Sequence, residues 1–258
     1  MNYIKEAITK ESEIIPIHKS LNFIKGSLSV CRLLLDNNLG TGFFIKFKNE
    51  TINRKYQFFL MTCSHIINNK IINLNNIVLN IYYHYNSIHK QIILNKNERF
   101  IKDYSDYKVD ITIIEIKPED NISWVYFLEP DYNIINGFDQ YENSTIIIHQ
   151  YPLGNEQCYS KGKVINIINE EKLLQYTSST EKGSSGSPII KVGSTLVFGV
   201  HNGGEYNNDY YGNNNQGNFI IDVLNDNERI NNQEIYHEEE YYNFINLIKM
   251  KRLDNNKL

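Results

Sequence analysis

Short apolar stretches separated by turn residues recur along most of the chain, which is the pattern of an all-β protein. Some stretches alternate apolar and polar positions, as at 77–83, and others are continuously apolar, as at 146–148. Glycine, asparagine, aspartate and proline cluster between them and mark the turns. The pattern predicts strands over these main segments: 27–35, 41–47, 56–67 (which ends in a turn), 109–116, 144–148, 162–168, 194–201 and 219–223.

The pattern changes in three other places. Residues 118–143 hold two prolines, the single tryptophan and several polar turns, which is typical of a crossover between two groups of strands. Residues 1–20 are mixed in character and are interpreted as an N-terminal arm. From 238 to 253, apolar residues recur with helical spacing, with glutamates early and basic residues late, so we expect a C-terminal helix and tail over 236–258.

A tight turn of small residues at 181–188, with the sequence EKGSSGSP, is the first sign of chemistry. Ser185 lies at its centre. A serine nucleophile needs a base, a group that orients the base, and backbone N–H donors for the oxyanion. The N–H groups of Gly183 and Ser185 could supply those donors. A structural loop of small residues is the alternative interpretation.

Two upstream segments supply candidates for the base and its orienting carboxylate. His65 ends an apolar strand, and Asp110 opens an alternating one. The chain order His, Asp, Ser is one of the orders in which a catalytic triad occurs. Asp110 is favoured over Asp103 and Asp106 because it directly precedes the strand, and Asp106 is the fallback. His18 lies too early in the chain to be the base. The other histidines compete for that role, but none lies at a strand end that pairs with an Asp-strand and a Gly-Ser turn: His84, His89, His149, His201 and His237.

The segments MTCSHII, DITIIEI and GSSGSP together resemble the trypsin/chymotrypsin-like serine peptidases over about residues 21–225. The resemblance is closest to glutamyl endopeptidases and intracellular trypsin-like domains. It implies an all-β fold of two packed six-stranded antiparallel β-barrels with a C-terminal α-helix. The peptidase domain would span 21–235, with barrel 1 at about 21–118 and barrel 2 at about 140–225.

The same resemblance implies an acyl-transfer mechanism on a protein or peptide substrate, with His65, Asp110 and Ser185 as the triad. No metal or cofactor takes part in it. Near the Ser turn, the resemblance implies substrate-binding positions at Thr180, His201, Gly203 and Gly204. An imidazole and a hydroxyl suit a P1 glutamate or aspartate, whereas an apolar or aromatic P1 is the alternative.

The residues around the pocket also argue against some activities. Ser179 stands where an acidic residue would be needed to bind a P1 Arg or Lys. Asn202 replaces the usual tryptophan, which changes the pocket's shape. The α/β-hydrolases are disfavoured because Ser187 occupies the last glycine position of their elbow and because their triad order differs. The rival from another class is a catalytically silent or partner-activated trypsin-like domain used in binding or signalling.

Charge and cysteine content indicate which partners and which cellular compartment to expect for the protein. The net charge is −4 with no basic stripe, so nucleic acid is not an expected partner. The three cysteines give no disulfide framework and no metal-ligand spacing, which favours a reducing compartment. Each is interpreted as a small buried hydrophobe. The N-terminus is too charged for a secretory signal and no 18-residue apolar run occurs, so we expect a cytoplasmic protein without membrane contact.

Overall fold

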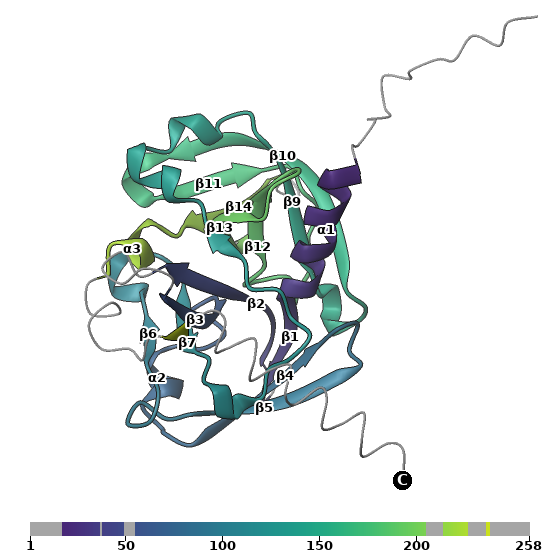
Figure 1. The fold of residues 1–258 in the computed structure, drawn as a ribbon. Helices are drawn as coiled ribbons and strands as arrows, with labels where there is room; N and C mark the ends of the chain where they lie inside the picture. Colours follow the sequence, from purple (N-terminus) through teal and green to yellow (C-terminus); the bar gives the residue numbers. More distant parts are fainter. Residues whose placement is uncertain (1–16, 37, 49–54, 205–213, 227–235, 238–258) are drawn as a thin grey trace, which may run out of the picture.

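The strands of the protein form two β-sheets that lie against each other (Figure 1). The computed structural model describes residues 17–36, 38–48, 55–204, 214–226 and 236–237. The predicted C-terminal helix and most of the predicted N-terminal arm lie outside these residues.

The first sheet has the strand order β5-β4-β1-β2-β3-β7-β6, with β15 paired to β3. Its neighbours along this order are antiparallel. The strands are β1 (Val30–Leu35), β2 (Asn38–Lys48), β3 (Lys55–Thr62), β4 (Ile77–Tyr83), β5 (Ile88–Leu94), β6 (Ile101–Asp103), β7 (Thr112–Glu115) and β15 (Tyr236–His237).

The second sheet closes into a six-stranded antiparallel barrel, because β12 pairs with both β9 and β13. A seventh strand, β8, runs parallel to β13 at its side. The strands are β8 (Glu129–Pro130), β9 (Thr145–Gln150), β10 (Cys158–Ile168), β11 (Leu173–Tyr176), β12 (Pro188–Lys191), β13 (Leu196–Gly204) and β14 (Asn215–Phe219). The predicted double-barrel architecture is confirmed, with the first sheet as an open half-barrel.

Helices are few and short in the described part of the chain. The α-helices are α1 (Ile17–Ser29), α2 (Asn69–Ile72) and α3 (Ile221–Leu224). The crossover between the sheets and several turns contain 3₁₀ helices at Ser105–Tyr107, Pro118–Asp120, Tyr132–Asn136, Asp139–Tyr141, Pro152–Gly154 and Asn169–Glu171.

Two strand predictions are wrong at their ends. Residues 27–29 finish α1 rather than beginning a strand. The helix lies against the second barrel, where Phe23 contacts the rings of His149 and Tyr159. The strand predicted at 219–223 instead ends at Phe219, and the chain turns into α3. The polar residues that precede Phe219 form β14, because the backbones of β11 and β13 pair with this strand on both sides.

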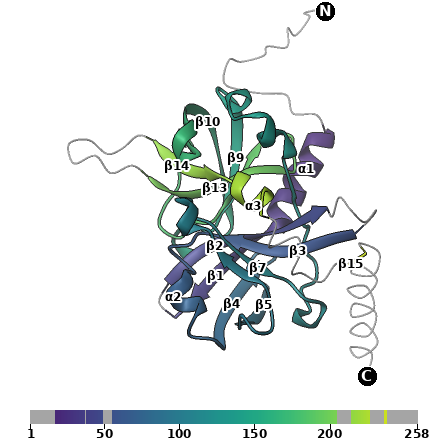
Figure 2. The same cartoon turned by 90° about the vertical axis from the view of Figure 1, so that its left-hand side faces the viewer.

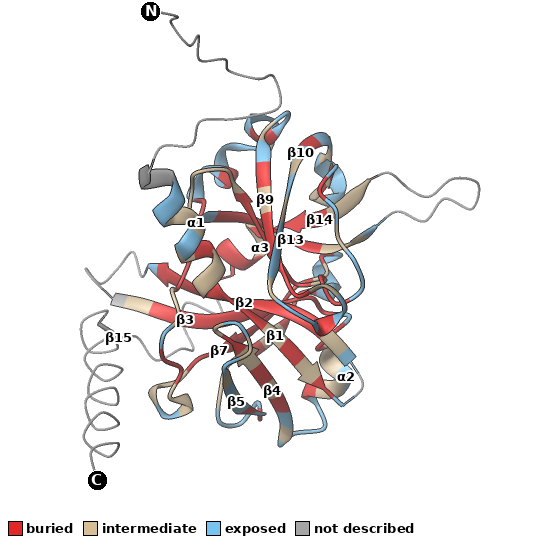
Figure 3. Cartoon of the chain, turned by 90° about the vertical axis from the view of Figure 1, so that its right-hand side faces the viewer, coloured by how far each residue is buried: buried red, intermediate tan, exposed pale blue. Residues whose placement is uncertain are grey.

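The core of the described structure is largely apolar. Figure 3 shows that the inner strands are mostly buried. The strands β2 and β3 carry long runs of fully buried residues, including Phe43, Phe44, Phe58 and Phe59. Strands buried on both faces lose the simple alternation of half-buried ones. Seen from the opposite side to Figure 3, the first sheet lies below the second, with β2 close to the boundary (Figure 2). This boundary carries the candidate site.

Candidate active site

The His65 turn is fixed to the start of β7 by side-chain hydrogen bonds. The Ser64 hydroxyl donates to the carbonyl of Ile111 at 2.8 Å, and the Thr112 hydroxyl donates to the carbonyl of Ile67 at 2.7 Å. All four groups lie away from solvent, so these bonds form in a low dielectric. They bring Asp110, which lies two residues before the start of β7, beside the histidine.

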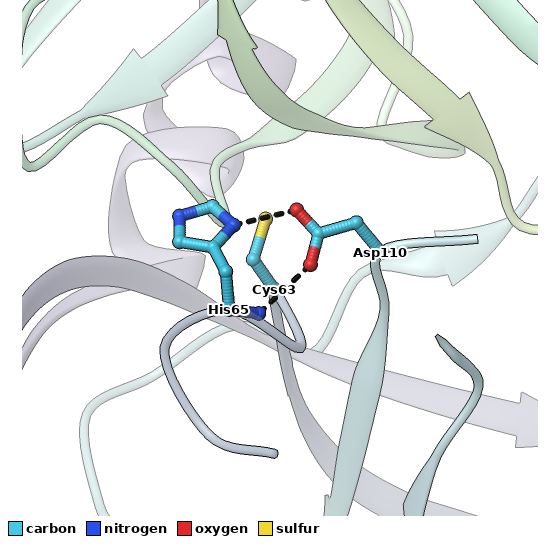
Figure 4. A group of neighbouring side chains, drawn as sticks. All are labelled: Cys63, His65 and Asp110. Carbon is cyan, nitrogen blue, oxygen red and sulfur yellow. Dashed lines mark hydrogen bonds and ion pairs between the residues drawn. The ribbon is translucent and has the colours of Figure 1, made fainter. Parts of the chain in front are cut away.

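Asp110 holds His65 at two points (Figure 4). The ring Nδ1 of His65 lies 2.6 Å from Oδ2, and the backbone N–H of His65 donates to Oδ1 at 2.9 Å. The His65 side chain is 49% exposed and that of Asp110 24%. A carboxylate that accepts from Nδ1–H orients the ring and leaves Nε2 free to take a proton.

The other two candidate aspartates lie elsewhere. Asp103 accepts from the backbone N–H groups of Asn69 and Ser105, so its role is to hold local structure. Asp106 is exposed in a 3₁₀ helix. Among the three, only Asp110 contacts His65 in the described structure.

The Ser turn of the second barrel docks on β2 of the first sheet through Thr41. The N–H of Thr41 donates to the carbonyl of Ser185 at 2.8 Å, and its hydroxyl donates to the carbonyl of Gly183 at 2.8 Å. Gly183 and Gly186 have φ angles of +93° and +90°, which glycine adopts without strain. A Cβ on Gly186 would lie 1.9 Å from the Thr41 carbonyl oxygen. Sequence reasoning missed Thr41, although the GTG at 40–42 was a visible signal.

The hydroxyl of Ser185 points toward the carbonyl of Asn202, at 3.4 Å. It makes no hydrogen bond to His65 in the described structure. The backbone N–H groups of Gly183 and Ser185 donate to no acceptor in the described part of the chain. Donors left free beside a serine hydroxyl are available to an anionic oxygen.

The proposed pocket residues are tied into the second barrel. The hydroxyl of Thr180 donates to the side-chain oxygen of Asn215 at 2.8 Å. His201 is buried, and its Nδ1 lies 2.6 Å from the hydroxyl of Tyr176 and 3.2 Å from the carbonyl of Gln216. Burial lowers the pKa of His201 to about 4, so its ring is neutral at pH 7.

Gly203 and Gly204 end β13. That strand pairs with β12 as far as Val200, and beyond it only β14 pairs with the last residues of β13 in the described structure. The edge from Asn202 onward is therefore available to another extended chain. A Cβ on Gly203 would meet no atom within 4 Å.

One cluster in the described residues has the donor atoms of a metal site. Cys63, His65 and Asp110 each offer a ligand atom, all within 4.8 Å of one another. Cys63 is fully buried, and its thiol donates to the carbonyl of His201 at 3.2 Å. Burial raises the pKa of this thiol. Sequence reasoning gave Cys63 no role beyond packing.

The cysteines are free, as expected, and Cys31 and Cys63 are buried. The interpretation of Cys158 as a buried hydrophobe is wrong, since this residue is exposed on β10. Among the described residues, none of the helices is both long enough and apolar enough to span a membrane.

Comparison with solved structures finds the same fold in serine proteases. The serine endoprotease from Yersinia pestis has 12% identity and a TM-score of 0.57, covering 84% of this chain and 68% of that one. An inactive serine-to-alanine mutant of Rv3671c from M. tuberculosis H37Rv has 16% identity and a TM-score of 0.54, covering 89% and 100%. An HtrA-type protease with a bound tripeptide has 10% identity and a TM-score of 0.57, covering 83% and 64%.

The sequence itself was compared with curated proteins and with family models. No curated protein matches it. The family model described as the trypsin-like peptidase domain matches residues 40–200, which include the His65 turn, Asp110 and the Ser turn. Since this match covers more than half of the chain, the protein belongs to the trypsin-like peptidase family and is a serine endopeptidase.

Proposed function

We propose that this peptidase cleaves its substrate with His65 as base, Asp110 as orienting carboxylate and Ser185 as nucleophile. The observation that carries the proposal is the double contact of Asp110 with His65, at 2.6 Å to the ring and 2.9 Å to the backbone. Two contacts fix both the tautomer and the position of the ring, which a single surface ion pair does not do. The peptidase domain spans 21–235.

In the proposed reaction, the Ser185 hydroxyl turns from the Asn202 carbonyl to His65 Nε2 and attacks the scissile carbonyl. His65 takes the hydroxyl proton and passes it to the leaving amine. Asp110 stabilises the imidazolium that forms between these two transfers. The N–H groups of Gly183 and Ser185 bind the oxyanion, and water then hydrolyses the acyl-enzyme.

The substrate binds as an extended strand along the free edge at Gly203 and Gly204. Backbone hydrogen bonds at a strand edge hold the peptide, and a side-chain pocket then selects one residue of it. A neutral His201 has one hydrogen-bonded nitrogen, Nδ1, and no partner at Nε2 in the described structure. With its proton on Nε2, the ring donates to a P1 carboxylate, and we therefore propose preference for P1 Glu or Asp. The free thiols fit a reducing compartment such as the cytoplasm.

A fluorophosphonate probe tests the nucleophile directly, because it reacts with a serine only when the base is in place. We expect the wild-type protein to be labelled and Ser185→Ala and His65→Ala not to be. Peptides that differ only at P1 then test the pocket. Labelling of Ser185→Ala at the wild-type rate would refute the assignment of the nucleophile.

A partner-activated peptidase is the second candidate, and the Ser185 contact favours it. In the described structure the Ser185 hydroxyl lies 3.4 Å from the Asn202 carbonyl and is not bonded to His65. If folded wild-type protein is not labelled alone but is labelled in the presence of a partner protein, this second form of the function holds.

A further inference from the structure

Cys63 lies beneath the His65–Asp110 pair, and the proposed reaction does not use it (Figure 4). Its sulfur, the Nδ1 of His65 and a carboxylate oxygen of Asp110 lie within 4.8 Å of one another. In the described structure the thiol's hydrogen bond to the His201 carbonyl, at 3.2 Å, is a weak one.

These three atoms are the kinds of ligand that zinc takes in proteins. Zn²⁺ binds thiolate sulfur at about 2.3 Å, imidazole nitrogen at about 2.0–2.1 Å and carboxylate oxygen at about 2.0–2.2 Å. Tetrahedral geometry with those bond lengths places the ligand atoms about 3.3–3.6 Å apart. The three ligand atoms lie within 4.8 Å of one another, a limit that is wider than the spacing around a zinc ion. A small movement of the Cys63 sulfur toward His65 and Asp110 would bring it to that spacing.

The contact between Nδ1 and Oδ2 has to lengthen for the ion to enter. It measures 2.6 Å, so the ring must move outward by somewhat under about 1 Å to match the zinc geometry. His65 can make this movement because its side chain is 49% exposed. Cys63 directly follows β3, and Asp110 lies two residues before β7. Because the His65 side of the site is exposed, solvent can supply a water as the fourth ligand.

We propose that Cys63, His65 and Asp110 form a binding site for Zn²⁺ or a similar thiophilic divalent cation, and that its occupation switches the peptidase off. The switching rests on the proposed function of His65, whereas the binding of the ion does not. Residues Cys63 and His65 are two positions apart in one turn, and the third ligand comes from the neighbouring strand start. This placement brings the three ligand residues together in the folded chain.

Metal binding removes the base by moving a proton. The Cys63 thiol loses its proton to solvent as the sulfur binds the ion. The neutral ring of His65 gives up its Nδ1 proton, since Nδ1 now binds the metal, and takes up a proton from solvent at Nε2. A ring with Nε2–H cannot accept the proton of Ser185. Chelation of the ion reverses each of these steps.

Cadmium gives a readout of binding that needs no activity. A Cd²⁺–thiolate bond produces an ultraviolet charge-transfer band, and we expect one Cd²⁺ equivalent to produce it in the Ser185→Ala protein. Cys63→Ala in the same background should abolish the band. Cys31→Ala and Cys158→Ala are the matched controls, because they remove a buried and an exposed thiol that are not part of the cluster, and they should keep the band. A band that survives Cys63→Ala would overturn the site.

Inhibition is measured by fluorophosphonate labelling. For each variant, the labelling rate with Zn²⁺ is divided by the rate without Zn²⁺, and these ratios are compared. We expect Zn²⁺ to slow wild-type labelling and EDTA to restore it. Loss even of an outer-shell partner weakens metal binding by about 10–100-fold. The Zn²⁺ concentration for half inhibition should therefore rise at least about tenfold in Cys63→Ala or Cys63→Ser. Two different substitutions of Cys63 are made because either one alone could fail to fold, and one folded variant is enough for the comparison.

The two readouts separate failure of the site from failure of the proposed function. Cadmium binding without any fluorophosphonate labelling would leave the metal site standing and would count against the triad. Labelling that Zn²⁺ slows equally in wild type and in the Cys63 variants would overturn the metal site and leave the triad intact.

Discussion

The hydroxyl of Tyr176 lies 2.6 Å from Nδ1 of His201, inside the second barrel. Tyr176 comes from β11 and His201 from β13, and the strand between them, β14, pairs with both. Both side chains are buried. In the Nε2–H tautomer the Tyr176 hydroxyl donates to Nδ1, and the ring N–H at Nε2 is the donor that the proposed P1 carboxylate requires. In the other tautomer Nδ1–H donates to the carbonyl of Gln216 at 3.2 Å, so the Tyr176 hydroxyl is the group that favours the Nε2–H form.

Tyr176→Phe should reduce the preference for P1 Glu over P1 Gln. Removing the hydroxyl takes away one buried hydrogen bond, worth about 1 kcal/mol or roughly fivefold. The measurement is kcat/KM for two peptides that differ only at P1. Tyr151→Phe is the matched control, because that buried tyrosine bonds to Gln157 at 3.2 Å and does not touch His201. An equal fall for both peptides would show that Tyr176 only supports the barrel.

Asp110→Asn should leave the fold intact and lower the rate of hydrolysis by about 10⁴-fold. An asparagine keeps the shape of the side chain, but its neutral amide does not stabilise the imidazolium or hold the same tautomer. The measurement is the labelling rate together with a circular dichroism spectrum. Asp106→Asn changes an exposed carboxylate nearby and should keep the wild-type rate. If Asp106→Asn is the slow variant, the assignment of the two aspartates is wrong.

Local pattern was enough to predict the all-β fold and the order of its motifs. The strands before His65 and after Asp110 carry apolar runs that only a buried strand explains. The proximity of His65 and Asp110, 45 positions apart, could be inferred only from the resemblance of three segments at once. The structure then supplies the 2.6 Å contact.

Tertiary contacts decided the features that the sequence pattern did not predict. Residues 27–29 alternate like a strand, but Gly26 lets the helix α1 approach His149 closely, since a Cβ there would lie 2.6 Å from Nε2. The strand β14 is polar, and pairing on both sides holds it in place. Thr41 and Tyr176 act through partners more than 20 positions away, which no local pattern reveals.

Gly186→Ala should destabilise the protein more than Gly137→Ala. Both glycines have a positive φ, at +90° and +112°, so both substitutions strain the backbone by about 1–3 kcal/mol. Only Gly186 also lacks space, because its Cβ would lie 1.9 Å from the Thr41 oxygen, whereas nothing lies within 4 Å at Gly137. Overpacking adds about 1–3 kcal/mol. Urea unfolding measures the difference, and equal losses would contradict the close contact.

His149 should make the protein less stable at acid pH. Its ring is buried between β9 and α1, and burial lowers its pKa to about 4 from 6.5. The folded state therefore holds the ring neutral, while the unfolded chain takes up a proton as the pH falls below 6.5. Stability from this residue is present above pH 6.5 and is lost as the pH falls toward 4. Between pH 7 and pH 5 the loss is about 2 kcal/mol.

The variant His149→Gln separates this contribution from that of other groups. Glutamine does not titrate, so the change in unfolding free energy between pH 7 and pH 5 should be about 2 kcal/mol smaller than in the wild type. Absolute stability is not compared, because the substitution also alters packing against Phe23. His201 has a similarly lowered pKa and is present in both proteins, so its contribution cancels. An identical pH dependence in the two proteins would show that His149 is protonated equally in the folded and unfolded states.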